Sequence, residues 1–109
     1  MVTQRNKPRD VVFRAIADPT RREILGLLRG GRLSVNDIAR NFHTSRPAIS
    51  RHIRLLRTAG LVSTCQVGTA RICMLNAKPL RAIDRWLRDY EALWDASLSK
   101  LKAHVEESP

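Results

Sequence analysis

With 109 residues, the chain is near the lower end of the usual size of one domain, so we expect a single domain over residues 1–109. Its 20 Lys and Arg residues exceed its 10 Asp and Glu residues, and this net charge of +10 favours a polyanionic partner over a small acidic ligand. No apolar run approaches the ~20 residues of a membrane span and the N-terminus is polar, so we expect a cytoplasmic protein that does not contact membranes.

The first part of the chain predicts three helices. Apolar residues at positions 11, 12, 15 and 16 have helical spacing, and this helix ends before Asp18 because Pro19 cannot continue it. A second helix, capped by Asp18 or Thr20, ends at the two glycines at positions 30 and 31. Ser34 can cap a third, short helix, with Asp37 in place of the Glu or Gln of a full capping box.

The fourth helix has the clearest start in the sequence. Thr44 and Ser45 offer a hydroxyl cap, and Pro47 lies in the first turn, where its missing N–H costs little. Apolar residues at positions 49, 53 and 56 form a buried stripe, to which His52 can add, and the helix ends at Gly60. Residues 61–67 and 70–75 are rich in β-branched or apolar residues, and the break at positions 68 and 69 predicts a β-hairpin.

The positive charge is concentrated around this fourth helix. Residues 38–83 contain eight Lys and Arg residues and no Asp or Glu, whereas solvated surfaces normally mix both signs. Three helices, a capped arginine-bearing helix and a hairpin follow one another in the order of a winged helix-turn-helix, so we predict a mainly α fold with a small β-hairpin. Such a protein places one helix in the major groove of double-stranded DNA.

The predicted DNA contacts lie on the fourth helix and the hairpin. Arg46 and Arg51 can read the O6 and N7 atoms of guanine, while Arg54 and Arg57 lie closer to the DNA backbone. The hairpin can touch an adjacent minor groove or a phosphate. The complete predicted set is Thr44, Ser45, Arg46, Ser50, Arg51, Arg54, Arg57, Thr69 and Arg71.

The C-terminal part predicts one long amphipathic helix over about residues 79–106. Its apolar residues step by three or four positions, and a helix of this length spans roughly 40 Å. A domain this small cannot cover such a stripe, so we expect a homodimer held by this helix; the alternative is that the helix packs along its own domain. The expected dimerisation residues are Leu80, Ile83, Leu87, Tyr90, Trp94, Leu98 and Leu101.

Several segments also resemble a known family. They are residues 17–25 (ADPTRREIL), 45–53 (SRPAISRHI), 56–57 (LR) and 59–62 (AGLV), with Gly68, Arg71, Leu75 and Asn76 of the hairpin. Together they look like the ArsR family of bacterial transcriptional repressors, and the match covers nearly the whole chain, although Cys73 stands where an aromatic residue is usual. The resemblance implies a homodimeric winged-helix repressor that binds operator palindromes and is dimerised by its terminal helices.

The founding members of that family sense metals, and this chain departs from them. Ser34 and Asn36 stand in the positions of a Cys-x-Cys pair, so both thiolates are absent. At the other family site, Asp84 can be the first ligand, but the remaining positions hold Trp86, Ser97 and Lys100. The resemblance is closest to the non-metal-sensing branch, matched here by Trp86, Tyr90 and Trp94, so we expect no metal and no cofactor.

The sequence is also compatible with other functions. The net charge alone would suit an architectural DNA-binding protein that does not read sequence. Alternatively, Cys65 and Cys73, on paired strands, could face one another and form a thiol switch for a repressor. An enzyme finds no support, because the sequence has no Gly-rich phosphate loop, no paired carboxylates and no nucleophile with a base. The favoured prediction is a sequence-specific transcriptional regulator, most simply a repressor.

Overall fold

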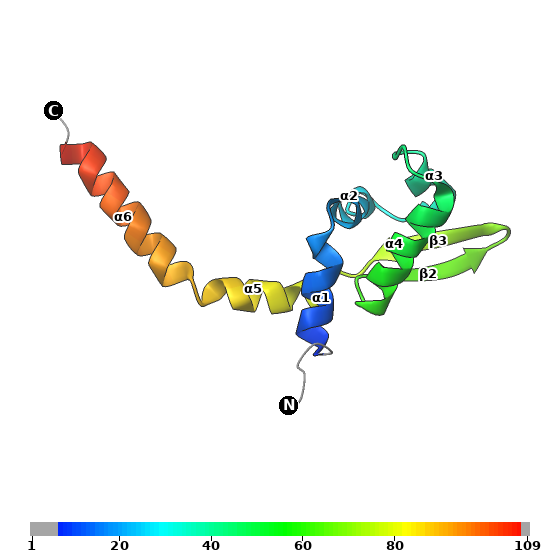
Figure 1. Cartoon of the computed structure of the whole chain (residues 1–109), viewed down its shortest axis with the longest axis horizontal. Coiled ribbons are helices and arrows are strands. Elements are labelled where there is room, and N and C mark those ends of the chain that lie inside the picture. The colour runs from blue at the N-terminus through cyan, green and yellow to red at the C-terminus, as the bar shows by residue number, and fades with distance from the viewer. Residues whose placement is uncertain (1–6, 108–109) are drawn as a thin grey trace.

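The structure, a computed structural model, describes residues 7–107, apart from the side chains of residues 99, 106 and 107. It is mainly helical, with a small antiparallel sheet (Figure 1). The elements, in chain order, are α1 (Pro8–Ala17), α2 (Pro19–Leu28), β1 (Leu33–Ser34), α3 (Val35–Ala39), α4 (Arg46–Thr58), β2 (Val62–Val67), β3 (Ala70–Leu75), the short 3-10 helix η1 (Lys78–Leu80), α5 (Arg81–Arg88) and α6 (Glu91–Glu107). This architecture confirms the predicted fold class.

Side-chain caps fix where α2 and α3 begin. Helix α1 ends before Asp18, and the Asp18 carboxylate accepts a hydrogen bond of 3.0 Å from the backbone N–H of Arg21, so Asp18 rather than Thr20 caps α2. Ser34 caps α3 by accepting from the backbone N–H of Asp37 at 3.1 Å. The caps predicted from the sequence therefore place the turns between these helices.

Helix α4 is bounded as predicted at both ends. The Ser45 hydroxyl accepts from the backbone N–H of Ala48 at 3.3 Å. At the other end, Gly60 has a φ of +77°, which a residue with a side chain rarely adopts. Gly60 donates to the carbonyl of Arg57 and Leu61 donates to that of Leu56, both at 2.9 Å, which is a Schellman motif. This turn sends the chain directly from α4 into the hairpin.

The hairpin is the wing of the fold, and it belongs to a three-stranded sheet in the order β1-β3-β2. Strands β2 and β3 pair from Val62 with Leu75 to Val67 with Ala70, around a turn in which Gly68 has a φ of +61°. The sequence did not predict β1, because two residues are too few to show an alternating pattern. Strand β1 pairs with β3 through Leu33 and Cys73 and so attaches α3 to the wing.

One hydrophobic core joins helices α1 to α4 with the base of the wing. The largest fully buried side chains belong to α2, α3, α4, the start of the wing and β3, and they are Ile24, Ile38, Ile49, Leu56, Leu61 and Cys73. The buried side of α4 is therefore part of the core, so its opposite side is held at the surface in a fixed orientation. Across residues 7–107, no helix combines the length and apolar character that crossing a lipid bilayer demands.

The single long C-terminal helix expected from the sequence is wrong: the structure has η1 and two α-helices there. The backbone N–H groups of Asp89 and Tyr90 donate to the carbonyls of Trp86 and Leu87, three residues earlier. These bonds interrupt the regular α-helical pattern, in which each N–H donates to the carbonyl four residues earlier. Neither residue is Gly or Pro, and apolar spacing continues across the break, so periodicity could not locate it. Helix α6 extends away from the body (Figure 1), and the radius of gyration is 18.9 Å, against about 13 Å for a compact chain of this length.

Candidate nucleic-acid interface

The outward side of α4 carries basic side chains that the core does not use. Ile49, Ile53 and Leu56 are buried, whereas Arg51 and Arg54 are exposed on the opposite side. Among the described residues, neither Arg51 nor Arg54 has a carboxylate within ion-pair distance. An α-helix held in this way presents fully charged guanidinium groups to a partner.

A cleft of about 190 Å³ separates α4 from the wing. Its lining comes from α3, α4 and β3, and consists of Val35, Arg46, Ser50, Ile53, Arg54, Arg57 and Arg71. Four of the predicted DNA contacts on α4, namely Arg46, Ser50, Arg54 and Arg57, are thus brought together with the wing residue Arg71. A second, more open hollow continues from Arg54 and Arg57 along β2 to Ser63 and Thr64.

Two arginines of this cleft are oriented by neutral hydrogen-bond acceptors. The Arg46 guanidinium donates through Nε to the side-chain oxygen of Asn36 on α3. The Arg71 guanidinium donates to the Thr64 hydroxyl on β2 at 3.3 Å. Because neither acceptor is charged, these contacts leave the positive charge of both side chains uncompensated. Arg40 differs, because it forms a 2.8 Å ion pair with Asp37.

The remaining predicted contacts have different surroundings. Thr44 is exposed just before α4, and Thr69 is exposed at the turn of the wing. The hydroxyl of Ser45 is exposed but serves as the helix cap. Arg51 lies outside the cleft lining, on the outer side of α4. The predicted contacts therefore form three groups. One group lines the cleft, a second consists of the exposed residues Thr44, Ser45 and Thr69, and Arg51 on the outer side of α4 stands alone.

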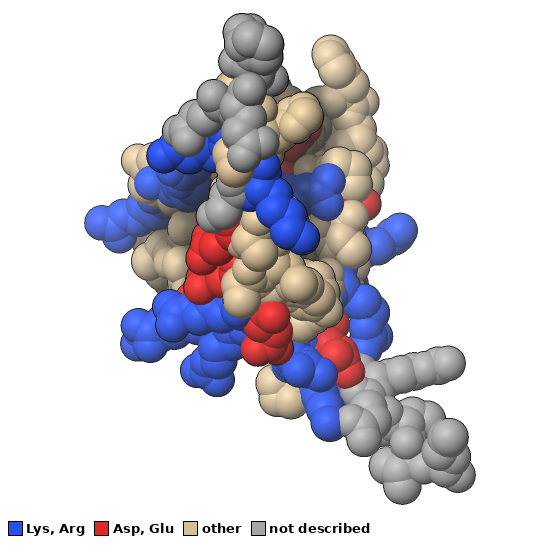
Figure 2. All heavy atoms as spheres, turned by 90° about the vertical axis from the view of Figure 1, so that its left-hand side faces the viewer, with Lys and Arg blue, Asp and Glu red and all other residues tan. Residues whose placement is uncertain are grey.

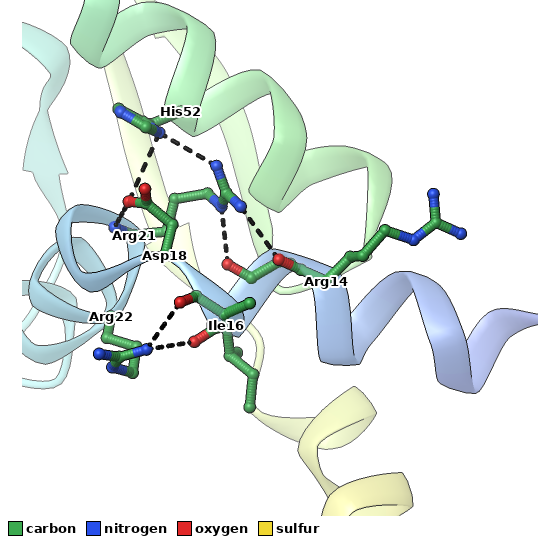
Figure 3. Close-up of polar contacts among 8 residues, drawn as sticks. Arg14, Ile16, Asp18, Arg21, Arg22 and His52 are labelled. Atoms are coloured by element: carbon green, nitrogen blue, oxygen red, sulfur yellow. Dashed lines mark hydrogen bonds and ion pairs between the residues drawn. The ribbon is translucent and has the colours of Figure 1, made fainter. Parts of the chain in front are cut away.

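Two arginines that follow the Asp18-Pro19 break tie α1 to α2 (Figure 3). The Arg21 side chain donates to the carbonyls of Ala15 at 2.7 Å and Arg14 at 3.0 Å. Arg22 donates to the carbonyls of Ile16 at 2.8 Å and Ala17 at 3.1 Å. The last four carbonyls of α1, which have no partner within the helix, are all satisfied in this way.

His52 extends this network into α4 (Figure 3). Its Nδ1 atom lies 3.3 Å from the Arg21 guanidinium and 3.9 Å from the Asp18 carboxylate. The pKa of Asp18 is lowered, first by the hydrogen bond from the Arg21 backbone, against a smaller effect of burial, and further by the charges of His52 and Arg21. The sequence analysis did not predict this link; the only signal was the pair of arginines after a capped helix break. The network fixes α4 relative to α1 and α2.

The expectation that Cys65 and Cys73 face one another is wrong, because the two cysteines lie on opposite faces of the wing. In the register of the hairpin, Cys65 pairs with Ile72 and Cys73 pairs with Thr64, and adjacent positions on a strand point to opposite faces. Cys65 is exposed and Cys73 is buried. Burial raises the pKa of the Cys73 thiol, although the charges of Arg71 and Arg57 act in the opposite direction. An intramolecular disulfide would require the strand register to change.

The end of the molecule that carries α6 has mixed charge. Figure 2 shows this side, with Asp and Glu side chains in the middle of the face and Lys and Arg side chains around them. On α5, Arg88 forms a 2.9 Å ion pair with Asp84. Residues 84–109 contain four Lys and Arg against six Asp and Glu, so the basic excess does not extend to the C-terminal helices.

Some residues of the predicted dimerisation stripe pack against the core, and the others are exposed to solvent. Leu80 and Ile83 pack against the chain's own core, which corrects the expectation that the whole stripe is open to a partner. Leu87 is half-buried. The remaining members are exposed, together with Leu93, which the sequence analysis missed: Tyr90, Trp94, Leu98 and Leu101 have exposed fractions of 40%, 48%, 63% and 59%.

Aromatic side chains connect this exposed stripe to α1. The ring of Trp86 packs edge-on against Phe13 at 5.4 Å and against Tyr90 at 5.2 Å. Trp86 nevertheless remains 41% exposed. The apolar surface therefore runs from the outer side of α1 across α5 and onto α6.

A family model described as "Bacterial regulatory protein, arsR family" matches residues 18–64. The transcriptional repressor SdpR of Bacillus subtilis is 40% identical over 79 residues, which are 72% of this chain and 88% of that protein. The HTH-type transcriptional regulator Rv2034 of Mycobacterium tuberculosis is 38% identical over 90 residues, which are 83% of this chain and 81% of that protein.

A solved structure of the same family has a similar fold. A crystal structure of an ArsR family transcriptional regulator superimposes with a TM-score of 0.74 at 34% identity, covering 82% of this chain and 98% of that one. The matched region of the family model contains α2, α3 and all of α4, which are the elements that position the arginines described above. The chain therefore belongs to the arsR family of bacterial regulatory proteins, and it is a DNA-binding transcriptional regulator with a winged helix-turn-helix fold.

Proposed function

We propose that the protein is a homodimeric repressor that binds a pseudo-palindromic operator, with α4 of each protomer in a major groove and the wing on the neighbouring backbone. The observation that carries this proposal is the outer side of α4. Arginines without a carboxylate partner among the described side chains project from it, while the other side of the helix is in the core. A rigid helix with this charge fits the major groove.

The base contact is assigned to Arg51. It lies outside the cleft and points away from the core, so it can reach the base edges when the helix enters the groove. A bidentate arginine–guanine pair would give sequence preference at that position. The arginines of the cleft, with Thr44, Ser45 and Thr69, are assigned to the phosphate backbone, which sets register and contributes affinity for any sequence.

The dimer is assigned to the exposed apolar surface of α1, α5 and α6. Helix α6 extends away from the rest of the described chain (Figure 1), and its apolar side chains Trp94, Leu98 and Leu101 are about half or more exposed. A second copy can bury these residues on a two-fold axis, which would also place two recognition helices against a two-fold symmetric DNA site.

We further propose that metals do not control DNA binding by this protein, although a relative from Staphylococcus xylosus, 33% identical over 79 residues, is named an arsenical resistance operon repressor. The proposal rests on the two positions where a Cys-x-Cys pair would stand. Ser34 caps α3, and Asn36 holds Arg46, so both have structural partners here. Among the side chains that the structure describes, no group of three or more His, Cys, Asp or Glu is close enough to hold a metal ion.

The test is to select DNA with the purified protein from random fragments and to sequence the bound pool. A repressor of this kind enriches one motif with two inverted half-sites separated by about one helical turn. A pool without any motif would instead identify a sequence-independent architectural protein. A reporter gene placed behind the selected motif then shows whether binding represses transcription.

A further inference from the structure

A groove lies between α1 and the second half of α4, and it shares no lining residue with the cleft beside the wing. Its volume is about 370 Å³, which falls within the range of about 300–1,000 Å³ that is usual for small-molecule sites. The groove is open on one side, and most of its lining surface is apolar. The lining residues are Val11, Arg14, Ala15, Arg21, Leu55 and Thr58.

The apolar part of this groove is aliphatic. Val11 is half-buried and Ala15 is buried, whereas Leu55 remains 44% exposed. The described lining includes no aromatic ring, so it offers no flat surface on which a ring can stack. A flexible hydrocarbon chain can follow the groove instead, and it removes its own surface and that of Leu55 from water.

The dimer surface proposed above lies on another side of α1. Phe13, which joins that surface through Trp86, comes two positions after Val11. At about 100° per residue, the side chains of Val11 and Phe13 point to nearly opposite sides of the helix. A second copy would also bring a chain of net charge +10 against the arginines of the groove. These two observations favour a small ligand over a second protomer.

The charge of the groove is positive. Its arginines are Arg14 and Arg21, and no Asp or Glu is among the described residues that line it. A guanidinium has five N–H donors, and Arg21 directs three of them to two carbonyls of α1 and to His52 Nδ1 (Figure 3). The charge of Asp18 acts on Arg21 from outside the lining. A carboxylate inside the groove would accept stronger, charge-assisted hydrogen bonds than these neutral acceptors do.

We propose that this groove binds an aliphatic carboxylate, with its hydrocarbon chain against Leu55 and its carboxylate at the arginines. Arg21 is also the residue that contacts His52 on α4. A carboxylate that draws the Arg21 guanidinium toward itself weakens this contact, which holds α4 relative to α1 and α2. Ligand binding therefore weakens DNA binding, and DNA weakens ligand binding by the same factor. This regulatory step rests on the proposed function, whereas the binding site does not.

The first arm of the test uses the DNA-free protein and octanoate. The methyl NMR signals of Val11, Ala15 and Leu55 should shift and saturate with octanoate. Acetate, which lacks the long chain, and octanol, which lacks the charge, should each bind about tenfold more weakly or worse. Leu55→Asp places a negative charge at the groove and should weaken octanoate binding by about tenfold. Arg14→Gln should weaken it by about fivefold, whereas Arg29→Gln removes the same charge outside the lining and should leave it unchanged.

These titrations have clear contrary outcomes. Circular dichroism first confirms that each variant is folded. The absence of a saturable shift, equal binding of acetate or octanol, or shifts confined to the exposed side chains of α6 would each overturn the binding site. Groove signals that change on dilution of the protein, and not with octanoate, would identify a second copy as the occupant and would also overturn it.

The second arm measures affinity for the selected operator, with acetate at equal ionic strength as the reference. Saturating octanoate should weaken DNA binding of the unaltered protein by about fivefold or more and should have little effect on Leu55→Asp. Unchanged DNA affinity at saturating octanoate would overturn the regulatory step. DNA selection that yields no motif would overturn the proposed function instead, and the octanoate titration of the DNA-free protein does not depend on that result.

Discussion

The role of Arg21 in positioning the recognition helix can be tested by replacing it with alanine. In the structure its guanidinium donates to the carbonyls of Ala15 at 2.7 Å and Arg14 at 3.0 Å, and lies 3.3 Å from His52 Nδ1. Only the contacts with Ala15 and His52 are partly buried. The truncated side chain leaves the end of α1 without these donors and frees His52 on α4.

The expected loss of stability follows from these contacts. A hydrogen bond from a charged donor contributes about 1.5–3 kcal/mol, and less where water can replace it. We count the bond to Ala15 at about this value and the other two at a fraction of it, which gives about 2–4 kcal/mol in total. For a domain of this size, such a loss lowers the melting temperature by roughly 10 °C or more.

The measurements are thermal unfolding at one fixed protein concentration and DNA affinity at a temperature where the variants are folded. Arg22→Ala is the matched control, because Arg22 also satisfies two carbonyls of α1 but, among the described residues, makes no hydrogen bond to α4. We expect both variants to lose stability and only Arg21→Ala to lose DNA affinity in addition. Equal losses of affinity in the two variants would refute the inference that the contact with His52 positions α4.

Four further predictions address the interface, the dimer, metals and pH. Arg51→Ala should weaken binding to the selected operator by about 1–3 kcal/mol in a competition assay; an equal loss on scrambled DNA would mean a phosphate contact. Trp94→Asp should convert the dimer to a monomer in sedimentation, and an unchanged mass would place the interface elsewhere. Zinc and arsenite should leave DNA affinity unchanged; a tenfold loss that chelator reverses would contradict this. Asp18→Ala should destabilise the protein by about 1 kcal/mol near neutral pH. Because the pKa of Asp18 is lowered in the fold, its charged form stabilises the native state above pH 3.8, and the difference should shrink in unfolding experiments as the pH falls below that value.

Local signals in the sequence were sufficient to predict most of the helices. The break at Pro19, the cap at Ser45 and the glycine at position 60 act within a few residues of the backbone they shape, so a single sequence reveals them. The hairpin was predicted for the same reason. The side of α4 that carries its arginines then followed from helical periodicity.

The features that the sequence analysis missed depend on contacts between distant residues. The link from Arg21 to His52 spans 31 positions, and the orientation of Arg46 by Asn36 needs α3 and α4 to be placed first. The positions of the two cysteines depended on the strand register, where a shift of one residue reverses the face of every side chain. The bend between α5 and α6 leaves the apolar spacing unchanged, so it is visible only in three dimensions.

The uneven distribution of charge along the chain affects how the protein approaches DNA. Residues 38–83 carry a net charge of +8, whereas the sequence from residue 84 onward has four Lys and Arg against six Asp and Glu. Helix α6, in this second part, extends away from the wing in a molecule 65 Å long (Figure 1). This arrangement is a large electric dipole, and the field of DNA exerts a torque on it before any contact forms. The wing and α4 therefore turn toward the DNA during diffusion, and α6 trails behind. Since this field extends only about 10 Å at 0.1 M salt, the orientation acts mainly in the last steps of the encounter and should weaken as salt is added.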